Sequence, residues 1–457
     1  MGAMAATASS RPLGAGRLGR SLRPARLAGR AALRWASTYL AFGEGRRRKR
    51  DQFVLRTAED VARTMGDMKG AVMKFGQILS MMTGFVPDEL AAQLASLQSN
   101  APPMAYELVE RVIEQELGAP PDRVFRRFER EPFAAASIGQ VHRARLRDGT
   151  GVAVKVQYPG VREAIAHDLA NVAMLVGMAG VVSPGLDAGP IVRDLKDGIL
   201  GELDYRREAA NQRRFSEEFL GHAFIRIPRV FAEYSTDRVL TQELLRGKPF
   251  AAALAWPEAA RQRLGEVIFR YAFGSIYRYG LFNGDPHPGN YVLLDDGAVG
   301  FVDYGCVAEF TPEMIGGFVR VIHALLADDH DAWRAAVEDI GILRRDAPFT
   351  TEQLWEHMHW YWAPILEPEV TFTPELAGEM IRRNTQTTGE GGRINKYCNV
   401  PPGMVFLTRI NFGLAGVLSQ LRARGPWRDI IREYIDGIPP VTELGRLSAA
   451  TSRGASV

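Results

Sequence analysis

Residues 284–305 constrain this chain more than any other segment. They begin Gly-Asp-Pro-His-Pro-Gly-Asn, and two prolines restrict the backbone of that loop. The apolar runs Tyr291–Leu294 and Val299–Val302 then predict two short strands joined by a turn. A loop held between such strands is unlike an ordinary turn with solvated acids. We therefore expect it to bring together three oxygen-bearing side chains: Asp285, Asn290 and Asp303.

Oxygen ligands of this kind suit a hard divalent cation, and phosphoryl transfer depends on positioned charge more than on covalent help from the protein. Asp285 and Asn290 are five positions apart, which is the spacing between the base and the metal-binding asparagine of a protein-kinase catalytic loop. Asp303 follows where the kinase Asp-Phe-Gly segment supplies its metal ligand. We predict a catalytic role for Asp285, and Mg²⁺ ligands at Asn290 and Asp303.

A second motif, Val-Ala-Val-Lys, ends at Lys155. It lies on the second of two expected strands, Val141–Leu146 and Val152–Gln157, which a turn containing Asp148 and Gly149 joins. A lone lysine in an apolar strand is ordinarily a snorkelling surface residue. The position of Lys155 nevertheless matches the kinase lysine that pairs the α- and β-phosphates of ATP, so we predict that role for it.

The run that precedes this lysine takes the place of the kinase glycine-rich loop. Ala134 and Ala136 stand where two of the glycines occur, while Gly139 and Val141 keep their places. Alanine does not reach positive φ at low cost, so the loop should be stiffer than a glycine loop. The predicted nucleotide-binding positions here and on a later strand are Ala134, Ala135, Ala136, Ser137, Gly139, Val141, Lys155 and Glu243.

Together these motifs resemble the UbiB/AarF atypical kinase-like family, from about Ala58 to about Arg424. Lys74-Phe75-Gly76-Gln77 matches the family's Lys-x-Gly-Gln motif, and the alanine-rich run matches its replacement of the glycine loop. Glu202-Leu203-Asp204 matches its Glu-x-Asp motif, and Glu208-Ala209-Ala210-Asn211 follows. Two departures are Tyr304, where phenylalanine is usual, and Asn283-Gly284, where relatives often have His-Ala.

The resemblance implies an α+β, two-lobed protein-kinase-like fold whose N-terminal helical extension covers the site where a protein substrate would bind. Lys74 and Gln77 would then point into the nucleotide pocket, and Glu202 would pair with Lys155, with Asp204 beside it. The implied ligands are ATP and Mg²⁺. Thr311-Pro312 follows Gly305 closely, which leaves no long activation segment to present peptides. No protein substrate is therefore expected.

Bulk properties fit a globular chain of several parts. The 457 residues contain 46% hydrophobic and 24% charged residues, and two cysteines give no disulfide framework. The best candidate for a membrane span, Leu169–Leu186, is short and interrupted by glycine and proline. The expected parts are a basic arm at 1–50, a helical extension at 51–130, a strand-rich lobe at 131–247, a helical lobe at 248–440 and a tail at 441–457. Within them we predict helices at Tyr106–Leu117 and at about 258–280, and a strand at Arg229–Tyr234.

The first 43 residues contain no Asp or Glu but several arginines. This arm is interpreted as a solvated segment, a transit peptide or a contact to an anionic membrane surface. Location is accordingly expected to be cytoplasmic or at a membrane periphery, and mitochondrial only if the arm is a transit peptide. No nucleic-acid partner is expected.

Two hypotheses of function remain open. One is an atypical kinase or ATPase that acts on a small-molecule or prenyl-lipid acceptor, such as a quinone precursor, or couples ATP hydrolysis to isoprenoid-quinone metabolism. The other is a nucleotide-gated scaffold, resembling a pseudokinase, at a membrane surface. An ordinary Ser/Thr protein kinase is disfavoured because the activation segment is so short.

Overall fold

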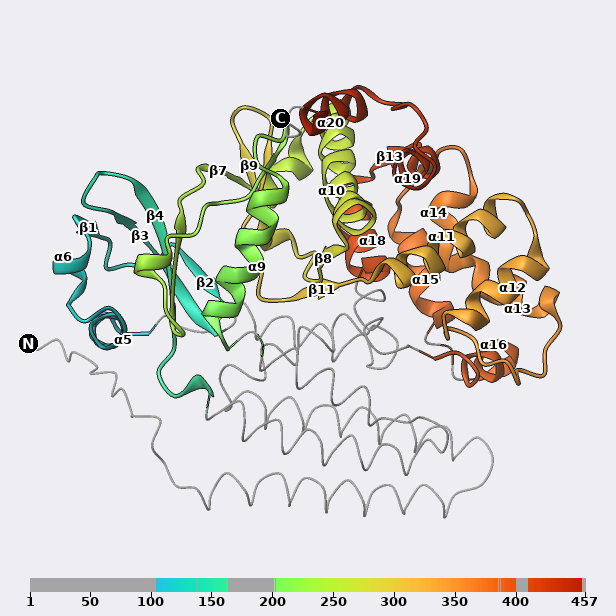
Figure 1. Cartoon of the computed structure of the whole chain (residues 1–457), viewed down its shortest axis with the longest axis horizontal. Coiled ribbons are helices and arrows are strands. Elements are labelled where there is room, and N and C mark those ends of the chain that lie inside the picture. Colours follow the sequence, from blue (N-terminus) through green and yellow to red (C-terminus); the bar gives the residue numbers. More distant parts are fainter. Residues whose placement is uncertain are drawn as a thin grey trace, which may run out of the picture.

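The computed structural model describes residues 104–136, 138–162, 201, 203–384, 386, 388–399 and 410–453. Six features predicted from the sequence lie outside these residues and stay predictions: the basic arm, residues 51–103 of the helical extension, the Lys74–Gln77 motif, Ser137, Leu169–Leu186 and Glu202. The described part has two regions, one rich in strands and one rich in helices, on opposite sides of Figure 1.

A five-stranded antiparallel sheet forms the first region. Its strands run in the order β1-β3-β4-β6, and β2 pairs with the start of β3 on the same edge that β1 occupies. The two strands predicted around the Asp148-Gly149 turn are confirmed as β3 and β4. The bounds are β1 (Arg127–Phe128), β2 (Ala134–Ala136), β3 (Gly139–Arg145), β4 (Gly151–Gln157) and β6 (Val239–Glu243).

Alternation along β4 divides this sheet into two faces. Val152, Val154 and Val156 are fully buried in a cluster that includes residues of helix α5 (Tyr106–Leu117), a helix whose predicted bounds are confirmed. The other face carries Lys155 and lies toward helix α9 (Tyr205–Glu218). The sheet therefore lies between two helices, and Lys155 projects from the face that α9 covers.

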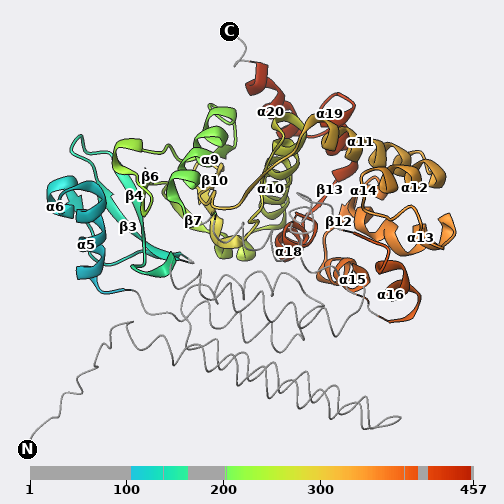
Figure 2. The same cartoon turned by 60° about the horizontal axis from the view of Figure 1, so that its bottom comes forward.

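The second region is built around α10 (Glu258–Tyr279), whose predicted helix is confirmed. A four-stranded sheet in the order β5-β10-β9-β7 and a two-stranded pair, β8 with β11, lie between α10 and the first region (Figures 1 and 2). These strands are β5 (Ile225–Arg226), β7 (Gly247–Pro249), β8 (Leu281–Asn283), β9 (Tyr291–Leu294), β10 (Val299–Phe301) and β11 (Val307–Glu309).

Helices continue the second region to its end, with one short strand pair among them. Their packing on α10 buries a large apolar core, and the α+β class is confirmed. The elements are α11 (Pro312–Leu326), α12 (His330–Asp339), α13 (Thr351–Met358), α14 (Ala363–Leu366), β12 (Val370–Thr371), α15 (Pro374–Asn384), α16 (Gly389–Asn395), α18 (Ala415–Leu421), β13 (Arg424–Gly425), α19 (Trp427–Ile435) and α20 (Glu443–Arg453).

One predicted strand is wrong. The run Arg229–Tyr234 forms a single bridge between Val230 and Gln242 and then turns into a short 3₁₀ segment at Ala232–Tyr234. Its apolar residues contribute to packing instead of to a strand, because Phe231 and Tyr234 pack against the hydrophobic cluster that includes α5. In the part of the chain that the structure describes, no helix is both long and apolar enough to cross a membrane.

Candidate functional site

Lys155 is the central cation of the site. Its Nζ donates to both carboxylate oxygens of Glu208, at 2.9 and 3.0 Å, and to Oδ2 of Asp303 at 3.2 Å. The three residues come from β4, from the first turn of α9 and from the loop after β10. One ammonium group thus joins the sheet, the helix and the second region of the molecule.

The two carboxylates that hold Lys155 differ in exposure. The Glu208 side chain is 1% exposed, whereas that of Asp303 is 31% exposed. Burial disfavours the ammonium form, but the carboxylates of Asp303 and Glu208 outweigh it and raise the pKa of Lys155 well above its ordinary value. The ring of Tyr205 lies 5.0 Å from Nζ and adds a cation–π contact. Lys155 therefore stays charged.

Two acids were predicted beside Lys155, and only one of them can be placed. Glu202 lies outside the described residues, so its pairing with Lys155 stays a prediction, whereas Asp204 is engaged at the start of α9 rather than with the lysine. The Asp204 carboxylate instead caps α9, accepting from the backbone N–H groups of Arg206 at 2.9 Å and Arg207 at 3.3 Å. An aspartate at this position satisfies free donors at the helix start. Glu208, one turn further along α9, is the residue that reaches Lys155.

The predicted catalytic loop forms between β8 and β9. Asn290 Nδ2 donates to the backbone carbonyl of Asp285 at 3.0 Å and to its Oδ2 at 3.2 Å. The backbone carbonyl of Asn290 accepts from Val302 N–H at 3.1 Å, directly before Asp303. The structure therefore brings Asp285, Asn290 and Asp303 onto adjacent chain segments.

Asn283 connects these segments, although in the sequence it stands out only as a departure from the family pattern. Its Nδ2 donates to the backbone carbonyl of Asp303 at 2.7 Å, and its Oδ1 accepts from Asp285 N–H at 3.3 Å. It also lies 3.4 Å from the hydroxyl of Tyr271, which bonds to the hydroxyl of Tyr304 at 3.2 Å. The two departures, at 283 and 304, thus belong to one buried network.

The alanine-rich run is a hairpin edge rather than an open loop. Ala134 pairs with Val141 and Ala136 with Gly139, so β2 folds back on β3 within a tight turn. A Cβ added at Gly139 would lie 2.3 Å from the carbonyl oxygen of Val156, which excludes any larger residue there. Val141 is the cross-strand neighbour of Lys155. The stiffness expected from alanine stays a prediction.

On β6 the side chain that faces the Lys155 site is that of Gln242, whereas the side chain of Glu243 lies on the other face; nucleotide binding by Glu243 stays a prediction. Leu240 belongs to the cluster with Tyr205 on the α9 side, and alternation places Gln242 on the same face. Glu243 is exposed on the other face, where its carboxylate accepts from Arg229 N–H at 3.3 Å. The Gln242 amide nitrogen lies 3.4 Å from the carbonyl oxygen of Val302.

A divalent ion at this site would have few protein ligands. Among the described residues, no group of three His, Cys, Asp or Glu side chains is placed to hold a metal. Mg²⁺ commonly takes one or two protein oxygens and completes its shell with water and substrate phosphates. Asp303 and the side-chain oxygen of Asn290 fit that need, since the amide nitrogen of Asn290 is engaged by Asp285.

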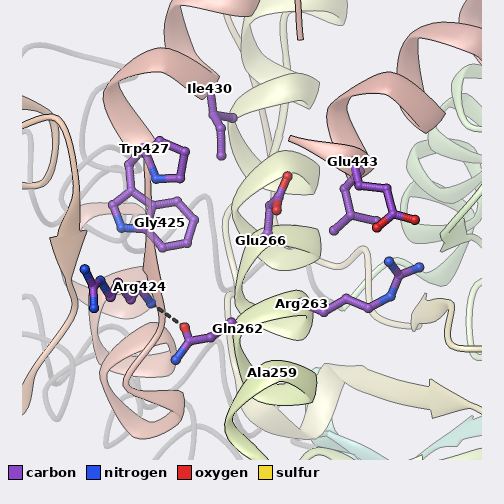
Figure 3. Close-up of a pocket in the computed structure, with 11 residues that line it drawn as sticks. Ala259, Gln262, Arg263, Glu266, Arg424, Gly425, Trp427, Ile430 and Glu443 are labelled. Atoms are coloured by element: carbon purple, nitrogen blue, oxygen red, sulfur yellow. Dashed lines mark hydrogen bonds between the residues drawn. The ribbon is translucent and has the colours of Figure 1, made fainter. Parts of the chain in front are cut away.

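A separate cavity of about 320 Å³ lies in the helical region, between α10, the start of α19 and α20. Figure 3 shows Trp427 on one side of it and Arg263 and Glu443 on the other. The Gln262 side chain accepts from Arg424 N–H across its lower part. None of its lining residues belongs to the Lys155, Asp285 or Asp303 segments, so it is distinct from the predicted site.

Three features together define a kinase-like protein. They are the strand-rich sheet, the helix whose glutamate pairs with a strand lysine, and the adjacent segments that carry Asp285, Asn290 and Asp303. The sequence profile of the ABC1 atypical kinase-like domain matches residues 96–337, more than half of the chain. The chain belongs to this family, whose members include proteins named UbiB and COQ8B.

Individual relatives agree with this assignment. A chloroplastic aarF domain-containing protein kinase of Arabidopsis thaliana is 34% identical over 68% of this chain and 44% of its own length. The mitochondrial atypical kinase COQ8B of Rattus norvegicus is 32% identical over 63% of this chain and 54% of its own, and a probable protein kinase UbiB of Pseudomonas paraeruginosa is 36% identical over 51% and 47%. The chain spans about half the length of these curated relatives.

A solved structure is similar as well. A Mycobacterium tuberculosis protein, determined in complex with erythromycin, superposes with a TM-score of 0.62 at 32% identity. The superposition covers 84% of this chain and 97% of that one. The kinase-like fold is therefore supported both by sequence and by shape.

Proposed function

We propose that this protein binds ATP with Mg²⁺ and acts as an atypical kinase or ATPase on a small-molecule or lipid acceptor. The observation that carries the proposal is that the two carboxylates bonded to Lys155 differ in their exposure to solvent. Glu208 is buried and holds the lysine in place, whereas Asp303 is partly exposed. Phosphate oxygens can therefore replace Asp303 at the ammonium group, which frees Asp303 for the metal.

Each residue has a distinct part in this proposal. Lys155 binds the α- and β-phosphates, and Asn290 and Asp303 hold Mg²⁺, which neutralises charge on the phosphate oxygens. Asp285 orients the acceptor hydroxyl or water and receives its proton. A small-molecule or lipid acceptor is supported by the short chain between Asp303 and α11, which leaves no long segment to present a peptide.

A link to isoprenoid-quinone metabolism is part of the proposal. It is supported by the family and by relatives that carry the names UbiB and COQ8B. The acceptor would then be a prenyl lipid or a quinone precursor, or ATP hydrolysis would drive a step in handling such a lipid.

Thermal unfolding with and without nucleotide tests the binding step. ATP with Mg²⁺, at about 100 times its dissociation constant, should stabilise the wild type by about 2.7 kcal/mol. Asp303→Asn should lose most of this stabilisation. Asp295→Asn, in the exposed turn between β9 and β10, is the matched control and should keep it. An unchanged response in Asp303→Asn would contradict the assignment.

The runner-up function is a nucleotide-gated scaffold at a membrane surface. It is favoured by the direct 3.2 Å contact of Lys155 with Asp303, which occupies two groups that catalysis needs. Phosphate release measured with vesicles of anionic phospholipid, and with a phenolic additive, separates the two functions. Turnover under any of these conditions supports the enzyme, whereas ATP binding without turnover supports the scaffold.

A further inference from the structure

Gln242 is a buried amide with one unmatched atom. The residue is 6% exposed, and its Nε2 lies 3.4 Å from the carbonyl oxygen of Val302. Its Oε1 is buried and has no hydrogen-bond partner within the described part of the chain. An unmatched buried acceptor costs about 1–3 kcal/mol, which makes it a place where a ligand donor is expected.

The orientation of this amide follows from its neighbour. Rotating the side chain by half a turn would direct its oxygen at the carbonyl of Val302, and two acceptors would then face each other. The nitrogen therefore faces Val302, and the oxygen remains an acceptor. A ligand that binds here must supply an N–H or O–H group.

Gln242 lies beside the phosphate-binding lysine on the same sheet face. It pairs across the ladder with Ala153, two positions before Lys155 on β4. Ala153 presents only a methyl group beside the amide. Val302, whose carbonyl oxygen the amide nitrogen faces, directly precedes Asp303. The unmatched oxygen is thus placed where the sheet, the lysine strand and the metal-binding loop meet.

We propose that Oε1 of Gln242 accepts a hydrogen bond from the exocyclic 6-amino group of adenine and so selects ATP over purine nucleotides with a 6-oxo group. A 6-oxo base would place a second acceptor against Oε1 and leave both unpaired. The inference rests on the proposed nucleotide site and goes beyond it, because it names the group that reads the base.

Binding of ATP and of inosine triphosphate to the full chain tests this inference. The two nucleotides carry the same phosphates and ribose and differ in the base, at the 6-position and the adjoining ring nitrogen. Calorimetric titration with Mg²⁺ should show ATP binding about tenfold more tightly to the wild type, as expected for one well-matched buried hydrogen bond. In Gln242→Met, which keeps the volume but removes the acceptor, the preference should fall to about twofold.

Gln212→Met is the matched control. Gln212 is also buried, and its Oε1 likewise has no hydrogen-bond partner among the described residues. Its Nε2 donates to the carbonyl of Pro228 at 2.7 Å, which is not part of the Lys155 cluster. This variant should keep the wild-type preference. Melting temperatures without nucleotide show whether each variant is folded.

The outcomes separate this inference from the proposed function. Equal affinity of the wild type for ATP and inosine triphosphate would overturn the role of Gln242 while leaving nucleotide binding intact, and this result needs no variant to fold. A folded Gln242→Met protein with the wild-type preference would also overturn it. Binding of neither nucleotide would contradict the proposed function together with the inference.

Discussion

The side-chain amide of Asn283 donates to the backbone carbonyl of Asp303 at 2.7 Å and ties the loop Gly284–Asn290 to the segment at Asp303. Asn283 is 8% exposed, so water does not readily replace it. Its Oδ1 also accepts from Asp285 N–H. A single side chain therefore fixes the distance between two residues whose separation matters for phosphate chemistry.

Replacing Asn283 by alanine should weaken both stability and nucleotide binding. The change leaves a buried carbonyl at Asp303 and an N–H at Asp285 without these bonds, which costs about 1–3 kcal/mol. Affinity for ATP with Mg²⁺ should fall about tenfold, which corresponds to about 1.4 kcal/mol. Titration and thermal unfolding measure the two effects. Asn283→His, which introduces the residue that relatives often carry, should recover part of the affinity. If Asn283→Ala kept the wild-type affinity for ATP, the positioning role of Asn283 would be contradicted.

A second prediction separates the two acidic residues at the start of α9. Glu208→Gln removes the charge that holds Lys155, so the lysine should pair more tightly with Asp303 and release it less readily. Affinity for ATP with Mg²⁺ should fall about tenfold.

Asp204→Ala is the control for Glu208→Gln, because Asp204 caps the same helix without touching Lys155. Loss of this cap should cost about 1 kcal/mol of unfolding free energy and leave ATP affinity unchanged. Thermal unfolding and nucleotide titration of both variants decide the assignment. Equal losses of affinity in the two variants would contradict the pairing of Lys155 with Glu208.

Local patterns predicted much of the framework. Strands β3 and β4 follow from apolar runs around an Asp-Gly turn, and α10 follows from its long apolar run after Pro257. The loop Asp285–Asn290 and the segment at Asp303 were predicted to meet because short strands join them, and the structure places them side by side. Each of these depends on residues that are close in sequence.

Two local features decide which side chains lie next to Lys155: the start of α9 and the phase of β6. The Lys155 partner depends on where α9 begins, and Asp204 as an N-cap sets that start at Tyr205, which directs Glu208 toward β4. In β6, counting alternate residues from the apolar Leu240 selects Gln242 and places Glu243 on the other face. Asn283 was not predictable from local pattern, because its partners at 271 and 303 come from other elements.

A third prediction concerns the buried ion cluster that joins α10 to the C-terminal helices. Arg270 is 2% exposed and bonds to Glu266 at 2.7 Å, to Glu433 at 2.7 and 3.0 Å, and to Thr442 at 2.9 Å. Arg270→Leu would leave the buried carboxylate of Glu433 and the partly buried carboxylate of Glu266 without their cation, so unfolding free energy should fall by about 3–5 kcal/mol.

Denaturant unfolding measures this loss, and Arg344→Leu provides the control. Arg344 pairs with Asp346 at the surface, where water and salt screen the charges, so its replacement should change stability little. If the two variants lost similar amounts of stability, the buried cluster would not be the stabilising feature inferred here.

The fourth prediction is a pH dependence that originates at His222. This side chain is 7% exposed, and its Nε2 lies 3.1 Å from the hydroxyl of Ser448 on α20, the helix that lies along the upper part of α10 in Figure 1. Its Nδ1 lies 3.4 Å from Phe224 N–H, an arrangement that suits a neutral ring. Burial, together with the positive charges of Arg278, Arg226 and Arg270, lowers the pKa of His222 to about 4.

Because the folded-state pKa lies below the ordinary value of about 6.5, the unfolded chain takes up the proton first as pH falls. The stability contributed by the neutral ring is therefore fully present above pH ~6.5 and is lost progressively between pH ~6.5 and ~4. At pH 5 the unfolding free energy has fallen by about 2 kcal/mol for this reason. His222→Gln cannot take up this proton, so its unfolding free energy should fall less than that of the wild type between pH 7 and pH 5. Parallel denaturant titrations at the two pH values measure the difference, and identical pH dependence in both proteins would show that His222 is not its source.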